Sequence, residues 1–213
     1  AVLVAGLRCS ELCDAPGWEE LAKRLCGWLD DEARRHEIEA LIEGGRFAAA
    51  IAYLSKRVER DAVVEVLKDA YPARESLPAT VASASAIPWR GVISTGFDGS
   101  WPAADGAPAF TAGDAAALAA HGGAFVLNLC GTTAAPETLR LGATELQAFG
   151  GALDALRVLA RRRSFVFVGF RAGDPDLALV MRALDGTGGP HFLFAEAAGL
   201  EAELLGDELG VTI

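Results

Sequence analysis

The stretch 91–98, GVISTGFD, carries polar residues directly after a short apolar run. Such a run is typical of a buried parallel strand, and open α/β sheets place their chemistry where the strands end. Thr95 could donate or accept a hydrogen bond, and Asp98 could act as an acid, although an aspartate here more often caps a loop. Gly96 lies between them without a side chain, so it is either a turn glycine or the place where a working residue is missing.

Two further apolar runs end in residues of chemical interest. AFVLNLC (124–130) ends in Cys130, which is followed by Gly131, and SFVFVGF (164–170) precedes Asp174. A cysteine at an apolar strand end is expected to be a neutral thiol, and a small buried hydrophobe is a commoner role than a nucleophile. Asp174 stands directly before a proline, an order typical of a helix N-cap followed by the first helical residue.

The first loop could hold an anion. AVLVAG (1–6) is followed by LRCSEL and a helical pattern, and backbone N–H groups at a strand–glycine–helix junction favour phosphate. Only Gly6 stands where the dinucleotide motif has two glycines. Ser10 could cap a helix or bond a phosphate or ribose. Arg8 could fill the site or pair with a phosphate through two hydrogen bonds; we favour exclusion or weak binding, because a glycine there normally lets the backbone approach a pyrophosphate.

The elements that must position these residues follow from apolar periodicity. Helical patterns dominate 17–86, where the stretch 37–70 is broken only at Gly44-Gly45. We predict one α/β domain over 1–213, with a Rossmann-like, mostly parallel sheet of about six strands and a helical insert at 17–86 between the first and second strands. The predicted strands are 1–6, 91–95, 124–130, 164–170, 191–195 and 210–213, with 107–110 as a further short candidate.

The composition of the chain limits the classes of partner that the protein is expected to bind. The 213 residues are 52% hydrophobic and carry a net charge of −10, which disfavours binding to nucleic acid or an anionic membrane. No apolar stretch reaches the roughly 20 residues of a membrane span, and the start lacks the basic region of a signal peptide. The four cysteines show no framework spacing, so free thiols in a reducing cytoplasm are expected. The chain begins with Ala, which suggests a domain of a longer protein.

Five motifs in order resemble the sirtuin-like family, in the bacterial branch of NAD-consuming domains without the zinc ribbon. The family opens with G-A-G-x-S and then G-x-P-x-W, and continues with an E-G-x-Y/F helical turn, T-N-Y-D, L-H-G and G-Y-S-L-x-D-P-D. The corresponding segments here are GLRCS (6–10) with DAPGW (14–18), EGGRFAAAIAYL (43–54), IPWRGVISTGFD (87–98), FVLNLCGTTAAPETLRLGATEL (125–146) and SFVFVGFRAGDPDLALVMRAL (164–184).

The resemblance implies a sheet that binds NAD across its strand edges and cleaves it to nicotinamide and an ADP-ribose species. The positions that it implies for cofactor binding, vestigial or weak here, are Gly6, Arg8, Ser10, Thr95, Asp98, Gly131, Gly169 and Asp174. The residues that the active family uses are replaced. Its Asn corresponds to Gly96, its His to Cys130, and its second glycine to Arg8. Without paired C-x-x-C motifs no metal is expected.

These losses predict a catalytically inactive sirtuin-like domain that serves as a protein-binding or assembly module, with no catalytic residue. Self-association or a protein partner is expected, through the insert 17–86. No cofactor is expected, although NAD or ADP-ribose stays open. One alternative is an active NAD glycohydrolase with a rearranged site that serves in phage defence. Another is a sensor that binds NAD or ADP-ribose without cleaving it. A cytoplasmic location is expected.

Overall fold

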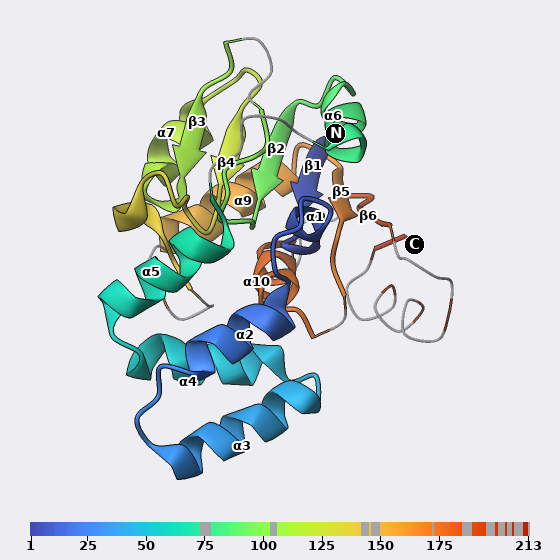
Figure 1. The fold of residues 1–213 in the computed structure, drawn as a ribbon. Helices are drawn as coiled ribbons and strands as arrows, with labels where there is room; N and C mark the ends of the chain where they lie inside the picture. The colour runs from blue at the N-terminus through green and yellow to red at the C-terminus, as the bar shows by residue number, and fades with distance from the viewer. Residues whose placement is uncertain are drawn as a thin grey trace.

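The structure of the chain, a computed structural model, is an α/β fold (Figure 1). It describes residues 1–72, 78–102, 106–141, 145, 150–171, 173–184, 189–194, 199, 203, 206 and 211–212. The strands are β1 (Val2–Ala5), β2 (Gly91–Ser94), β3 (Ala109–Thr111), β4 (Val126–Asn128), β5 (Phe165–Val168) and β6 (Phe192–Leu193). The helices are α1 (Arg8–Glu11), α2 (Trp18–Cys26), α3 (Glu32–Glu43), α4 (Phe47–Arg57), α5 (Arg60–Ala70), α6 (Ala79–Ser85), α7 (Ala115–Ala120), α9 (Gly150–Ala160) and α10 (Pro175–Leu184), with 3₁₀ turns at Ala112–Asp114 and Pro136–Thr138.

The strands form one parallel sheet in the order β3-β4-β2-β1-β5-β6. From β1 the chain moves to β2 on one side, whereas from β5 it moves to β6 on the other. Connections therefore leave in opposite directions between β1 and β5, and open α/β sheets bind ligands at the carboxyl ends of strands at such a switch point. The predicted Rossmann-like sheet is confirmed.

Both faces of the central strands β1, β2 and β4 are buried, which explains why these strands are apolar rather than alternating. One face carries Val2 and Val4 of β1, which belong to the large core shared with α2, α4, α9 and α10. The other face carries Leu3 and Ala5 in a smaller core with Cys9 and the residues Cys13, Val81 and Trp101. Successive side chains of β1 therefore point to different layers, as strand geometry requires.

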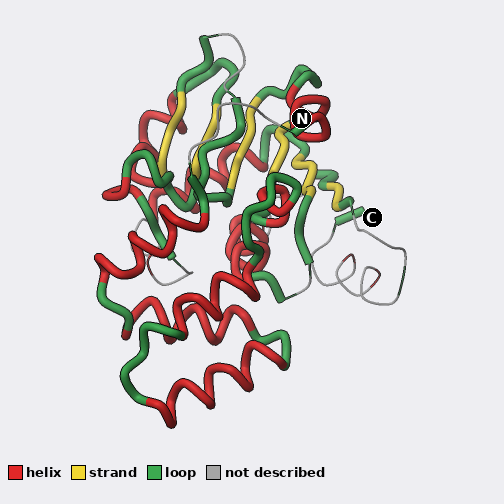
Figure 2. Tube along the Cα trace, viewed as in Figure 1, coloured by secondary structure: helices red, strands yellow, loops and turns green. Residues whose placement is uncertain are grey.

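Between β1 and β2 the described residues form the helices α1–α6, joined by turns and short loops, and no strand. Figure 1 shows α2, α3 and α4 together on the side to which the strand arrows point, and Figure 2 shows the same helices in red. α2 contacts α3, α4 and α5, and α4 also contacts α10, which joins this group to the sheet layer. The helices break at Gly44-Gly45 as expected. A second break was not foreseen: buried Val58 is extended (ψ 132°) and separates α4 from α5.

The edges of the sheet differ in detail from the expectation. The short candidate at 107–110 supplies a full strand, β3, which pairs with β4. At the opposite edge β6 has only two residues, and Thr212 forms an isolated parallel bridge with Phe192. Positions 195, 210 and 213 of the two predicted terminal strands lie outside the described residues. Within the described residues, none of the helices has both the length and the apolar character that a bilayer span demands.

Candidate functional site

Gly6 and Gly169 meet where the loops after β1 and β5 cross at the switch point. A β-carbon on Gly6 would lie 2.2 Å from the carbonyl oxygen of Gly169, too close for any side chain. Gly169 itself has φ +76°, a backbone conformation that favours glycine, and its β-carbon would lie 2.5 Å from Cys9 Sγ. The close approach of the two loops therefore accounts for a glycine at each position. The predicted role of these glycines in binding a nucleotide stays a prediction.

A cleft of about 360 Å³ opens beside this crossing. It lies between the first loop, the start of α2 and the loop before α10. Its lining residues are Arg8, Glu11, Gly17, Trp18, Glu19, Glu20, Phe47, Arg171 and Asp174. Arg8 Nε forms an ion pair with Glu11 Oε2 at 3.4 Å, and the Glu11 carboxylate lies against Gly17 at the start of α2. The predicted site residues Arg8 and Asp174 thus share one cleft.

Asp174 is the buried acid of this cleft. Its Oδ2 accepts a hydrogen bond from the backbone N–H of Arg171 at 2.7 Å, so the side chain braces its own loop, and Pro175 begins α10 as expected. Burial raises the pKa of the Asp174 carboxyl to about 7, and the nearby charge of Asp176 adds to the shift. The hydrogen bond from the Arg171 N–H and the positive charges of Arg8 and Arg171 act in the opposite direction and lower the pKa. This carboxyl therefore titrates near neutral pH.

Asp176 is a buried acid that the sequence analysis did not single out. It is 2% exposed, and its carboxylate accepts hydrogen bonds from the Leu7 N–H at 3.2 Å, from the Trp18 indole N–H at 2.9 Å and from the Thr95 hydroxyl. Burial raises its pKa, and these donors oppose the shift. The signal was present, because D-P-D places a second acid in the first turn of α10. The predicted Thr95 is fully buried and is bonded to Asp176.

Gly96 lies on the other face of the sheet edge, against Ser10. Its N–H donates to Ser94 Oγ at 3.2 Å, and a β-carbon on Gly96 would lie 2.8 Å from Ser10 Oγ. Ser10 is buried within α1, and the N-caps of α1 and α2 are Leu7 and Gly17, so of the two roles predicted for Ser10 the helix cap is wrong. Asp98 Oδ1 accepts from the Ser100 N–H at 3.2 Å, which confirms its loop-capping role.

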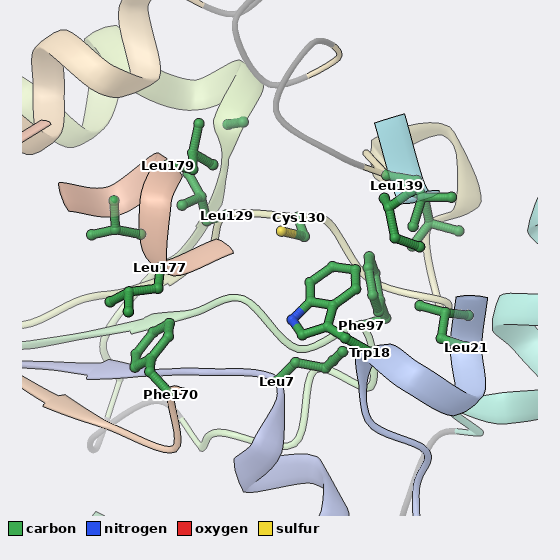
Figure 3. Close-up of a cluster of buried hydrophobic side chains, with 14 of the residues drawn as sticks. Leu7, Trp18, Leu21, Phe97, Leu129, Cys130, Leu139, Phe170, Leu177 and Leu179 are labelled. Carbon is green, nitrogen blue, oxygen red and sulfur yellow. The ribbon is translucent and has the colours of Figure 1, made fainter. Parts of the chain in front are cut away.

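Cys130 lies in the large apolar core. Figure 3 shows its sulfur among Trp18, Phe97, Leu129 and Leu139. The side chain is 2% exposed, and burial raises the pKa of the thiol well above its ordinary range. Cys130 is therefore a neutral thiol, as its apolar strand suggested. The next residue, Gly131, has φ +80°, and a β-carbon there would lie 2.2 Å from the Thr138 carbonyl oxygen.

The described residues bring the predicted positions to one end of the sheet but divide them between two faces. Arg8 and Asp174 line the cleft, Cys130 is closed into the large core, and Ser10, Gly96 and Asp98 gather on the α1 side. The three histidines offer no replacement base in these places. His191, for example, accepts the Phe165 N–H at 3.2 Å, and burial lowers its pKa.

An all-parallel sheet with helices on both faces and a cleft at its switch point defines a Rossmann-like α/β domain. The family model described as SIR2-like domain matches residues 91–213, more than half of the chain, so the chain belongs to the SIR2-like family. The match begins at β2 and includes Gly96, Cys130 and Asp174. A comparison with curated proteins finds none that matches.

Proposed function

We propose that this SIR2-like domain does not cleave NAD and instead serves as a protein-binding or assembly module within a larger protein. The burial of Cys130 carries the proposal. The active family resembled by this sequence uses a histidine there, which can take a proton near neutral pH. A thiol that is 2% exposed, with its pKa raised well above the ordinary range by burial, cannot take that role at neutral pH.

The environment of Gly96 supports the same proposal. The family places an amide at this position, and glycine has none. Ser10 Oγ already lies 2.8 Å from the point at which that side chain would begin. The residues at both reacting positions therefore do not fit the cleavage reaction.

The catalytic test is direct. Purified protein is incubated with NAD, and nicotinamide release is followed by chromatography. We expect no release above a protein-free blank. Turnover that disappears in Asp98→Ala would overturn the proposal and favour the active glycohydrolase, including a role in phage defence.

The helices α2–α5 are the proposed region for self-association or a protein partner. Trp28 lies two residues after α2 and is 49% exposed, so it presents a large apolar side chain on the surface of this group. Light scattering with size-exclusion chromatography would measure mass against concentration. We expect Trp28→Glu to reduce any self-association more than Ile87→Glu, because Ile87 is equally exposed (50%) but lies outside these helices. A monomer at all concentrations would leave a separate protein partner as the proposed role.

The cleft favours a second candidate, a sensor that binds NAD or ADP-ribose without cleaving it. Two arginines and the rings of Trp18 and Phe47 line it, and guanidinium groups suit phosphates. Calorimetry of wild type and Arg8→Gly with each ligand tests this. Binding that appears only in Arg8→Gly would identify Arg8 as the obstacle, whereas binding lost in Arg8→Gly would identify it as a phosphate contact. No heat with either protein at millimolar ligand would count against the sensor.

A further inference from the structure

Two buried acceptor atoms on the α1 side of the sheet lack a hydrogen-bond donor within the described part of the chain. They are Asp98 Oδ2 and Asn128 Oδ1. The two residues are only 7% and 9% exposed. Buried acceptors are nearly always paired, and an unpaired carboxylate oxygen is particularly costly, so both atoms need an explanation.

Asp98 and Asn128, which carry these atoms, form a cluster of oxygen-bearing residues with Ser94 and Ser10. Asn128 is the register partner of Ser94 on the neighbouring strand, so their side chains point to the same face. The point at which a β-carbon on Gly96 would lie is 3.5 Å from Ser94 Oγ, 3.4 Å from Asp98 Oδ1 and 2.8 Å from Ser10 Oγ. Three segments remote in sequence, namely α1, the end of β2 with its loop, and the end of β4, thus contribute oxygen atoms here.

The cluster is negative. Burial is the largest cause of the raised pKa of Tyr71, and the Asp98 carboxylate comes next; for Cys9, burial, Asp176 and Cys13 all raise the pKa more than Asp98 does. Its donor set consists of one carboxylate, two hydroxyls and one amide oxygen. Hard cations prefer such oxygens, but calcium takes six to eight oxygen ligands, and magnesium usually keeps several waters in a near-ideal octahedron. Among the described residues, no group of three or more His, Cys, Asp or Glu could hold a metal ion. A single charge therefore matches this site better than a double one.

We propose that Ser10, Ser94, Asp98 and Asn128 bind a monovalent cation, Na⁺ or K⁺. The ion satisfies the two unpaired acceptors and joins α1 to the ends of β2 and β4, so it stabilises the loop that carries Gly96. The small size of Gly96 keeps the approach open, because a side chain at that position would compete with Ser10 Oγ for the same space. This role is independent of NAD cleavage and of any protein partner.

The test is the melting temperature of the full chain in different chloride salts at one ionic strength. Na⁺ or K⁺ replaces choline stepwise, and circular dichroism follows unfolding. A ligand that binds only the folded state stabilises it by mass action, so we expect a saturable rise in Tm of roughly 4 °C or more at about 100 times the Kd. The comparison of Na⁺ with K⁺ identifies the ion. Equal Tm values in all three salts would overturn the proposal and leave a buried water as the partner of these atoms.

Two variants and a control test the ligands. Asn128→Leu keeps the branched shape of the side chain but removes the amide oxygen, and Asp98→Asn removes the charge. Each should abolish the dependence of Tm on the cation. Asp69→Asn is the control, because the Asp69 side chain is 85% exposed and should leave the dependence unchanged. A cation effect that persists in both site variants would place the ion elsewhere and overturn the assignment. If either variant fails to fold, the wild-type salt series still decides.

Discussion

The indole N–H of Trp18 donates a hydrogen bond to the buried carboxylate of Asp176 at 2.9 Å, linking the first turn of α2 to the first turn of α10. The same carboxylate accepts from Leu7 and Thr95, so segments after β1 and β2 converge on it. A buried charge in a protein persists only where donors surround it. Asp176 therefore joins the loops after β1 and β2 to the starts of α2 and α10 at the switch point.

Replacing Trp18 by Phe removes one donor while keeping a ring against Phe97, whose centroid lies 6.2 Å away. We expect a loss of about 1–3 kcal/mol in the free energy of unfolding, because a buried carboxylate oxygen loses a partner. Urea denaturation followed by circular dichroism measures it. Trp28→Phe makes the same chemical change at a side chain that is 49% exposed, and it should cost less than about 0.5 kcal/mol. Equal losses in the two variants would contradict a special role for Asp176.

Asp174 should make the protein less stable as the pH rises. Its pKa is raised from 3.8 to about 7 in the folded state, so between these values the folded state binds a proton that the unfolded state has released. Its contribution is full below pH 4 and is lost as the pH rises through about 7. Urea denaturation of Asp174→Asn and wild type from pH 4 to 8 isolates the effect, because Asp176, whose pKa is also raised, is present in both. We expect Asp174→Asn to become more stable relative to wild type as the pH rises. A stability difference that stays constant with pH would show that the Asp174 carboxyl behaves like an ordinary exposed acid.

Alanine substitutions at Gly131 and Gly45 distinguish the cost of backbone strain from the cost of a steric clash. Both have positive φ (+80° and +69°), so alanine is strained at either position. A β-carbon at Gly131 would meet the Thr138 carbonyl oxygen at 2.2 Å, whereas nothing lies within 4 Å at Gly45. We expect Gly45→Ala to cost about 1 kcal/mol and Gly131→Ala about 3 kcal/mol or more, measured by urea denaturation. Similar costs would mean that the loop after β4 shifts easily.

Cys130 should resist alkylation in the folded protein. The side chain is 2% exposed and burial raises the thiol pKa well above the ordinary range. The reagent therefore has little access to the sulfur, and little of the sulfur is in the reactive thiolate form. Iodoacetamide labelling at pH 8, resolved by peptide mass spectrometry, should be more than ~100-fold slower than in urea. A cysteine introduced by Leu12→Cys, at a position 55% exposed, provides the reactive control. Labelling of Cys130 at the rate of this control would show an open site and weaken the proposed inactivity.

Apolar periodicity was sufficient to predict the parallel sheet and the helical stretch between β1 and β2, because strands buried on both faces are apolar throughout. It did not predict the break at Val58, because that break depends on an extended residue buried in the core rather than on a glycine. The edge strand at 109–111 was the weakest signal in the sequence, and its pairing with β4 made it a full member of the sheet.

The residue types at 8, 96 and 130 are fixed by the sequence, and so is the absence of the amide and imidazole that the resembled family uses. Their surroundings are a product of the tertiary structure. Only the packing of α2 and the β4 loop closes Cys130 into an apolar core, and only the register of β2 with β4 puts Asn128 beside Ser94. Asp176 gained its contacts in the same way: three of its donors, on Leu7, Trp18 and Thr95, lie 81 to 169 residues away in the chain, at separations that no local pattern encodes.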